Sequence, residues 1–189
     1  MKNWLRLGLS LTAVLLLLAC GGGGDDDDGT LKTPAESLVG TYRLTGVYVT
    51  FDDGSSVTFE GDDLLDAGIH GELRITSASA YQTMTLEGQR YVASGTHQIT
   101  WNGPLGGTAS VSDSSGSSEF SFYIFGMTLV IDYGEYNFVK NWGMGARELM
   151  EWEKISNSVS AVSPAVAENA PKNVASFPIR VGDYMNLTP

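Results

Sequence analysis

Short runs of β-forming residues, bounded by Gly, Asp, Asn or Ser, follow one another from Leu38 to about Trp142. In several runs apolar and polar side chains alternate with a period of two, which places the two kinds on opposite faces of a strand. The clearest faces hold Phe120, Phe122 and Ile124 in one run and His97, Ile99 and Trp101 in another. This pattern restricts the chain to sheet architectures in which each strand buries one face.

The turns between these runs are short. Asp52, Asp53 and Gly54 separate a run at 39–51 from one at 56–59, and the Asp-Gly pair supplies the positive φ angles that a tight hairpin needs. Further runs fall at 72–76, 81–87, 90–93, 96–101, 108–112, 119–125, 127–132 and 136–140, with one helical turn at 62–67. Strands this close together leave no room for crossover helices, so an antiparallel up-and-down sheet is expected.

Nine or ten strands have to close or fold over to avoid long exposed edges. The sequence therefore predicts a mainly β fold, an up-and-down barrel of about 8–10 short strands over residues 38–142. A β-sandwich is the alternative. With hydrophobic residues at 42% of the chain, one domain of this size can bury a core.

The pattern changes after Gly143, where Leu149, Trp152, Ile155 and Val159 recur at intervals of three, three and four. This spacing predicts one C-terminal amphipathic helix over 143–157, packed on the outside of the barrel. Residues 158–189 are rich in Ser, Ala, Val and Pro, and their composition predicts a mobile tail. A docking strand at 177–181 is the alternative within that tail.

The first 20 residues have the features of an export signal. Lys2 and Arg6 precede the uncharged run 7–19, which is too short to span a bilayer as a helix. The run ends in Leu17-Leu18-Ala19-Cys20, which resembles the lipobox of bacterial lipoproteins. The resemblance implies a signal peptide at 1–19, cleavage between Ala19 and Cys20, and lipidation of Cys20. An ordinary signal peptide is the alternative.

Residues 20–37 are interpreted as the lipidated cysteine and a flexible tether. Four glycines from Gly21 give it flexibility, and the like charges of Asp25–Asp28 extend it. Such a tether reaches on the order of 25 Å as a coil and on the order of 55 Å when stretched. In Gram-negative lipoproteins an Asp after the cysteine favours retention in the inner membrane. Because Gly21 stands there, the resemblance implies the bacterial cell envelope, with the outer membrane favoured over the inner.

Charge and cysteine content exclude several classes of function. The chain has a formal net charge of -11, so it lacks the basic surface from which nucleic-acid binding draws its affinity. Anionic lipid would also repel it, so the lipid on Cys20 has to provide the attachment to the membrane. Cys20 is the only cysteine, so its lipidation leaves neither a disulfide nor a thiol nucleophile.

A second resemblance lies in the β-rich region. The opening Leu38-Val39-Gly40-Thr41-Tyr42 is similar to the first strand of bacterial lipocalin-like domains, although that family usually has Trp at the position of Tyr42. The strands at 71–75 and 136–140 also fit the family pattern. The resemblance implies a small β-barrel with a binding function.

No motif predicts catalysis. The chain has no Gly-x-Ser-x-Gly, and the available carboxylate pairs, such as Glu119 with Asp132, are what any acidic domain offers. His70 lies near acidic residues without the spacing of a metal site. The sequence therefore predicts no enzyme, no catalytic residue, no metal and no cofactor.

Aromatic side chains are concentrated in the β-rich region, where they either fill a small barrel or line a pocket within it. The predicted walls of a pocket for a small apolar ligand are Tyr42, His97, Trp101, Phe122 and Ile124. The expected function is that of a non-catalytic lipid-anchored envelope lipoprotein that binds such a ligand or an envelope partner. The alternative is a structural or assembly accessory acting through the sheet surface or the C-terminal tail.

Overall fold

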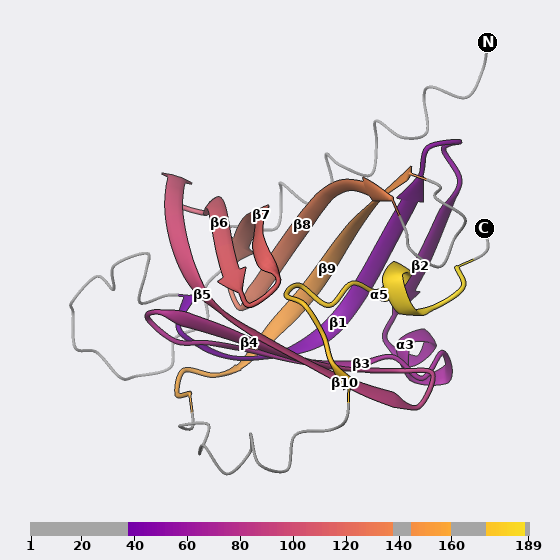
Figure 1. The fold of residues 1–189 in the computed structure, drawn as a ribbon, viewed down its shortest axis with the longest axis horizontal. Coiled ribbons are helices and arrows are strands. Elements are labelled where there is room, and N and C mark those ends of the chain that lie inside the picture. The colour runs from indigo at the N-terminus through magenta and orange to yellow at the C-terminus, as the bar shows by residue number, and fades with distance from the viewer. Residues whose placement is uncertain (1–37, 138–144, 160–172, 188–189) are drawn as a thin grey trace, which may run out of the picture. The chain divides into compact units, whose positions relative to one another are not determined.

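The alternating segments form the wall of a closed antiparallel barrel (Figure 1). The computed structural model describes residues 38–137, 145–159 and 173–187, which belong to one compact unit. The eight wall strands are β1 (Gly40–Phe51), β3 (His70–Ile75), β4 (Ser79–Leu86), β5 (Gln89–Gly103), β6 (Gly106–Asp113), β7 (Gly116–Phe125), β8 (Thr128–Asn137) and β9 (Gly145–Ser156). Each pairs with the next wall strand in the chain, and β9 pairs with β1 to close the ring.

Four smaller elements accompany the wall. The strand β2 (Ser56–Glu60) pairs with the second half of β1, and the helix α3 (Asp62–Asp66) follows it. Near the C-terminus, β10 (Asn173–Val174) runs parallel to β5, and the short helix α5 (Val181–Tyr184) comes after it. The closed ring confirms the predicted barrel and excludes the sandwich.

The up-and-down order gives the barrel two distinct ends. The start of β1, the end of β9 and the β3–β4, β5–β6 and β7–β8 turns share one end, which we call the mouth end. The β1–β2 and β6–β7 turns lie at the other, which we call the closed end. In Figure 1 the β3–β4 and β5–β6 turns are on the left, whereas α5 and the β1–β2 turn are on the right.

Period-two alternation determines what faces inward. In β4 the buried side chains are Ala80, Gln82, Met84 and Leu86, alternating with half-buried ones. In β1 the alternation shifts at an irregularity between Leu44 and Gly46, so that buried residues have even numbers before it and odd numbers from Val47 onward. Such a bulge lets one long strand bend around the wall without exposing its apolar residues.

Several expected strands are longer than the sequence predicted. The runs at 90–93 and 96–101 are one strand, β5, whose first half pairs with β4 and whose second half pairs with β6. Gly95 lies at that change of partner, where an added Cβ would come within 2.6 Å of a Val111 methyl and 2.7 Å of the Ser112 carbonyl oxygen. The runs at 127–132 and 136–140 likewise join into β8, although residues 138–140 lie outside the described residues.

The prediction of a helix at 143–157 is wrong. Residues 145–156 are the strand β9, so the barrel wall extends to Ser156 and does not end at 142. Its buried residues are Ala146, Glu148, Met150 and Trp152, a strict period of two. Ile155, which contributed to the helical spacing, is 52% exposed. Because the charged Glu148 occupies an inward position, the sequence of β9 lacks the regular alternation of apolar and polar residues that predicts a strand.

The prediction of a mobile tail is wrong for the part of the tail at 173–187. Five of its apolar residues belong to the core, namely Phe177, Ile179, Val181, Met185 and Leu187. The backbone N–H of Phe177 donates to Asp113 Oδ2 at 2.7 Å in the β6–β7 turn. The C-terminal segment, as we call residues 173–187, therefore closes the barrel at the end opposite the mouth. Residues 160–172 and 188–189 lie outside the described residues.

Candidate functional site

A pocket of about 390 Å³ opens at the mouth end, where the start of β1, the β3–β4 turn and the second half of β5 meet. The residues that line this mouth pocket are Leu38, Val39, Ile75, Thr76, Ser77, His97, Ile99 and Trp101. Apolar walls with a few polar groups are typical of small-molecule sites, whose volumes run from about 300 to 1,000 Å³.

A small cavity lies deeper in the barrel and shares Leu38, Ile75, His97 and Ile99 with the mouth pocket. Its volume is about 40 Å³, enough for only a few water molecules. Phe177 of the C-terminal segment is part of its lining, together with inward-facing residues of β6, β7 and β8. The interior of the barrel is therefore largely filled, and the mouth pocket is the space that a ligand can enter.

His97 is the polar residue common to both spaces. Its Nε2 lies 2.9 Å from the Thr76 carbonyl oxygen, and since a carbonyl accepts, this nitrogen carries the proton. The other ring nitrogen, Nδ1, is buried and has no hydrogen-bond partner among the described residues. An unsatisfied buried acceptor costs about 1–3 kcal/mol. Solvent does not reach Nδ1 from the mouth pocket, so a ligand there does not contact this atom.

The structure brings together part of the predicted wall. His97 and Trp101 line the mouth pocket, and Phe122 lines the cavity behind it. Trp101 and Phe122 pack edge to face with ring centroids 5.2 Å apart, so the pocket and the cavity share one aromatic wall. Ile124 packs against the core but lines neither space.

Tyr42 has a structural task instead. Its hydroxyl donates to the Leu38 carbonyl oxygen at 2.7 Å, and the Lys154 ammonium lies 5.7 Å from its ring centroid. Burial raises the pKa of the Tyr42 hydroxyl well above its usual value. Tyr42 thus holds Leu38, which lines the mouth pocket, but Tyr42 itself does not line the pocket. Sequence reasoning missed Leu38, Val39, Ile75, Thr76 and Ser77, because only the strand register places them beside β5.

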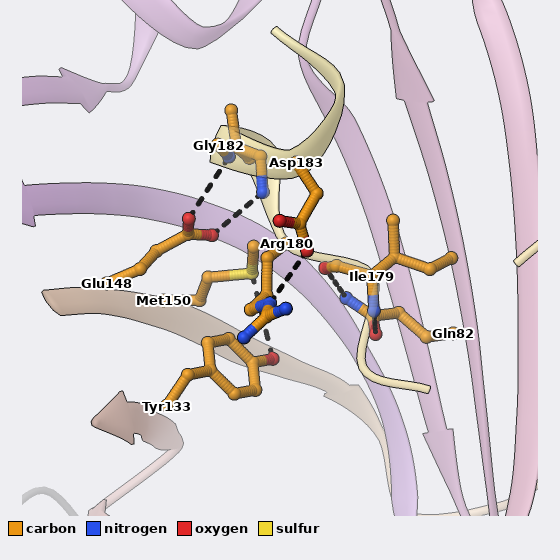
Figure 2. A network of polar contacts seen from close by, with 9 residues as sticks. Gln82, Tyr133, Glu148, Met150, Ile179, Arg180, Gly182 and Asp183 are labelled. Atoms are coloured by element: carbon orange, nitrogen blue, oxygen red, sulfur yellow. Dashed lines mark hydrogen bonds and ion pairs between the residues drawn. The ribbon is translucent and has the colours of Figure 1, made fainter. Parts of the chain in front are cut away.

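At the closed end, two polar side chains of the wall hold the C-terminal segment (Figure 2). The Gln82 amide pairs with the backbone of Ile179, donating to its carbonyl oxygen at 2.9 Å and accepting its N–H at 2.8 Å. The Glu148 carboxylate accepts the N–H groups of Val181 at 2.9 Å and Gly182 at 3.2 Å. Both side chains are fully buried, so each replaces water for backbone groups that enter the barrel.

Two further groups complete this network. Arg180 Nε donates to Asp183 Oδ2 at 2.8 Å, and Figure 2 shows the guanidinium beside the ring of Tyr133. Burial, together with the negative charge of Glu148, raises the pKa of the Tyr133 hydroxyl, which donates to the sulfur of Met150. The arrangement orders the C-terminal segment.

On the outer wall, Glu119 and Asp132 line one small pocket of about 160 Å³. Asp132 is held by the guanidinium of Arg147, whose Nε donates to Asp132 Oδ1 at 3.1 Å. His70 is exposed, and within 38–137, 145–159 and 173–187 no group of three or more His, Cys, Asp or Glu is arranged to hold a metal ion. A groove of about 540 Å³ runs along the outer wall beside α3, and its lining includes the charged Arg43, Asp62 and Glu72.

Acid is expected to weaken the fold through two aspartates. A hydrogen bond from the Ser115 hydroxyl and one from the Phe177 N–H lower the pKa of Asp113. Burial alone would raise the pKa of Asp132, but the Arg147 and Gly134 hydrogen bonds outweigh burial and lower it. A carboxyl group whose pKa is lower in the folded protein than in the unfolded chain stabilises the fold at pH values above its unfolded pKa of about 3.9. This contribution is lost as the pH falls through the pKa of the group in the folded protein.

Urea unfolding measured between pH 7 and pH 2 should show this loss below about pH 4. The matched variants Asp113→Asn and Asp132→Asn should each lose less stability over that range than the parent chain. If neither substitution changes how steeply the free energy of unfolding falls with pH, Asp113 and Asp132 are not the groups that cause the loss.

No model of a known protein family matches this chain, and no curated protein matches it either. Among the residues that the structure describes, no helix has the length and apolarity needed to cross a bilayer. The lipobox, Cys20 and the tether lie outside the described residues.

Proposed function

We propose that the chain is a non-catalytic lipoprotein of the bacterial cell envelope, anchored by lipid on Cys20, whose barrel binds a small apolar ligand in the mouth pocket. The observation that carries the binding role is the mouth pocket itself, with its apolar lining and its one histidine. The lipobox sequence Leu17-Leu18-Ala19-Cys20 carries the anchoring role. The outer membrane is the proposed location, because Gly21 follows the cysteine.

The size of the pocket limits the ligand. About 390 Å³ accommodates a single short chain or one fused ring system, and the nearly filled interior prevents deeper entry. The proposed ligand class is therefore a small, mostly apolar molecule.

The rival proposal is a structural or assembly accessory that binds an envelope protein. Binding of a partner through the C-terminal tail loses support, because Phe177, Ile179 and Val181 are buried in the core. Binding through the sheet surface is supported by the groove beside α3, where Leu65 and Ile155 are exposed. Deleting everything after Ser156 would not separate the proposals, because the deletion removes part of the fold.

Blocking the pocket is the direct test of the ligand proposal. The full mature protein is titrated with an apolar fluorescent probe, N-phenyl-1-naphthylamine. Ser77→Trp places a large side chain at the edge of the mouth pocket, and its control, Ser114→Trp, alters another exposed serine, in the β6–β7 turn. Ser77→Trp should weaken probe binding about ten-fold or more while Ser114→Trp leaves it unchanged. Equal binding by all three proteins, or none by the parent, would overturn the ligand proposal.

A further inference from the structure

The two ends of the barrel differ in charge. Each described turn at the mouth end lacks a charged side chain, namely 76–78, 104–105 and 126–127. Away from the mouth, the described turns carry Asp52 and Asp53 after β1 and Glu87 after β4, and Asp113 is the last residue of β6. In a chain with a net charge of -11, the described turns of the mouth end therefore add no repulsion from an anionic surface, and the partly exposed Glu153 at the end of β9 is paired with Arg43.

The mouth end also exposes large apolar side chains. The exposed fractions are 53% for Leu105, 45% for Tyr123, 54% for Phe125 and 63% for Met127. We call these four residues the mouth rim. They adjoin one another, since the Ile124 N–H donates to the Leu105 carbonyl oxygen and Tyr123 pairs with Gly106 across β6 and β7. Apolar residues gathered in this way mark an interaction surface.

A cation and the chain connection lie at this same end. The backbone N–H of Lys154 donates to the Met127 carbonyl oxygen, so the end of β9 borders the mouth rim. The Lys154 ammonium lies over the Tyr42 ring, and the partly exposed Glu153 beside it pairs with Arg43. Leu38, the first described residue, lines the mouth pocket, so the tether joins the barrel at this end. A lipid on Cys20 would therefore be joined to the barrel at this end, and the flexible tether leaves the orientation to the barrel's own surface.

We propose that the mouth rim rests in the surface of the lipid bilayer that holds the anchor, so that the mouth pocket opens toward lipid. The proposal rests on the proposed lipid anchor at Cys20. Apolar side chains of the mouth rim enter the interface, and the acidic turns at the opposite end point away from it. The occupant of the rim is lipid, and apolar ligands then reach the pocket from the bilayer rather than from water.

The test uses the full lipidated chain in vesicles of phosphatidylethanolamine and phosphatidylglycerol. Because Cys20 carries lipid, a cysteine introduced by Met127→Cys is the one site for a thiol-reactive fluorophore, and Ser114→Cys is the matched control at the closed end. Quenching by lipids that carry a spin label in the upper acyl chain reports insertion. Residue 127 should be quenched at least about three-fold more than residue 114.

Other results overturn the proposal in distinguishable ways. Equal quenching at both sites in vesicle-bound protein rejects the orientation but leaves the anchor intact. A fluorophore at residue 127 that is shielded from water without being quenched by lipid indicates a protein contact, with a second copy or another partner, and also rejects lipid as the occupant. Failure of the full chain to bind vesicles rejects the anchor, and with it the proposed function.

Discussion

Deleting residues 173–189 is expected to unfold the barrel. The deletion removes five buried apolar side chains and uncovers Gln82 and Glu148 in the wall. Burying one large apolar side chain contributes about 1.5–3 kcal/mol, whereas a whole domain is stable by only about 5–15 kcal/mol. Circular dichroism should show loss of the cooperative thermal transition, and a dye that binds exposed apolar surface should bind the truncated chain.

Two substitutions provide the matched comparison. Ile179 is completely buried, whereas Val174 of the same segment is 81% exposed. Ile179→Asp should therefore reproduce the effect of the deletion, and Val174→Asp should leave the transition unchanged. A truncated chain that keeps its cooperative transition within about 1 kcal/mol would show that the C-terminal segment is a dispensable tail.

The second large effect is expected from Glu148→Ala. The substitution leaves the N–H groups of Val181 and Gly182 without their acceptor inside the barrel. Each unsatisfied buried donor costs about 1–3 kcal/mol, so the free energy of unfolding should fall by about 2–6 kcal/mol. Urea unfolding measures the change.

Glu148→Gln is the control for shape. It keeps the length of the side chain and one carbonyl acceptor, so its loss should be smaller than that of the alanine variant. If Glu148→Ala were as stable as the parent chain, the carboxylate would not hold the C-terminal segment.

The barrel was predictable because each strand carries its own signal. Alternation at 97–101 and 120–124 shows which side chains face inward, and the Asp-Gly pair marks the first hairpin. The number of strands then favours a closed barrel, with a β-sandwich as the alternative that the pairing of β9 with β1 excludes. The lengths of β5 and β8 were not predictable, because tertiary pairing continues each strand through polar residues that look like a turn.

The two wrong predictions have one physical origin. The strand β9 was hidden because Glu148 occupies an inward position, and the C-terminal segment was hidden because its proline-rich composition suggested a tail. The two features are linked, because the buried Glu148 carboxylate accepts two backbone N–H groups from the C-terminal segment. The alternation of Phe177, Ile179 and Val181 was the signal that could have revealed the pairing.

The candidate site was predictable only where a single strand provides it. His97 and Trp101 share a face of β5, so period two identified both. The opposite wall comes from Leu38 and the β3–β4 turn, which reach the pocket through barrel closure. How far the barrel is filled was beyond the sequence, because Phe177 arrives from a distant segment.

The lipid anchor is tested most directly by the intact mass of the protein extracted from its own envelope. The prediction is a chain that begins at Cys20 and carries a diacylglyceryl group on the sulfur and an acyl chain on the amino group. Cys20→Ser should abolish that mass and release the protein from the membrane fraction. A chain that still begins at Met1, or one cut elsewhere with an unmodified Cys20 thiol, would contradict lipid anchoring.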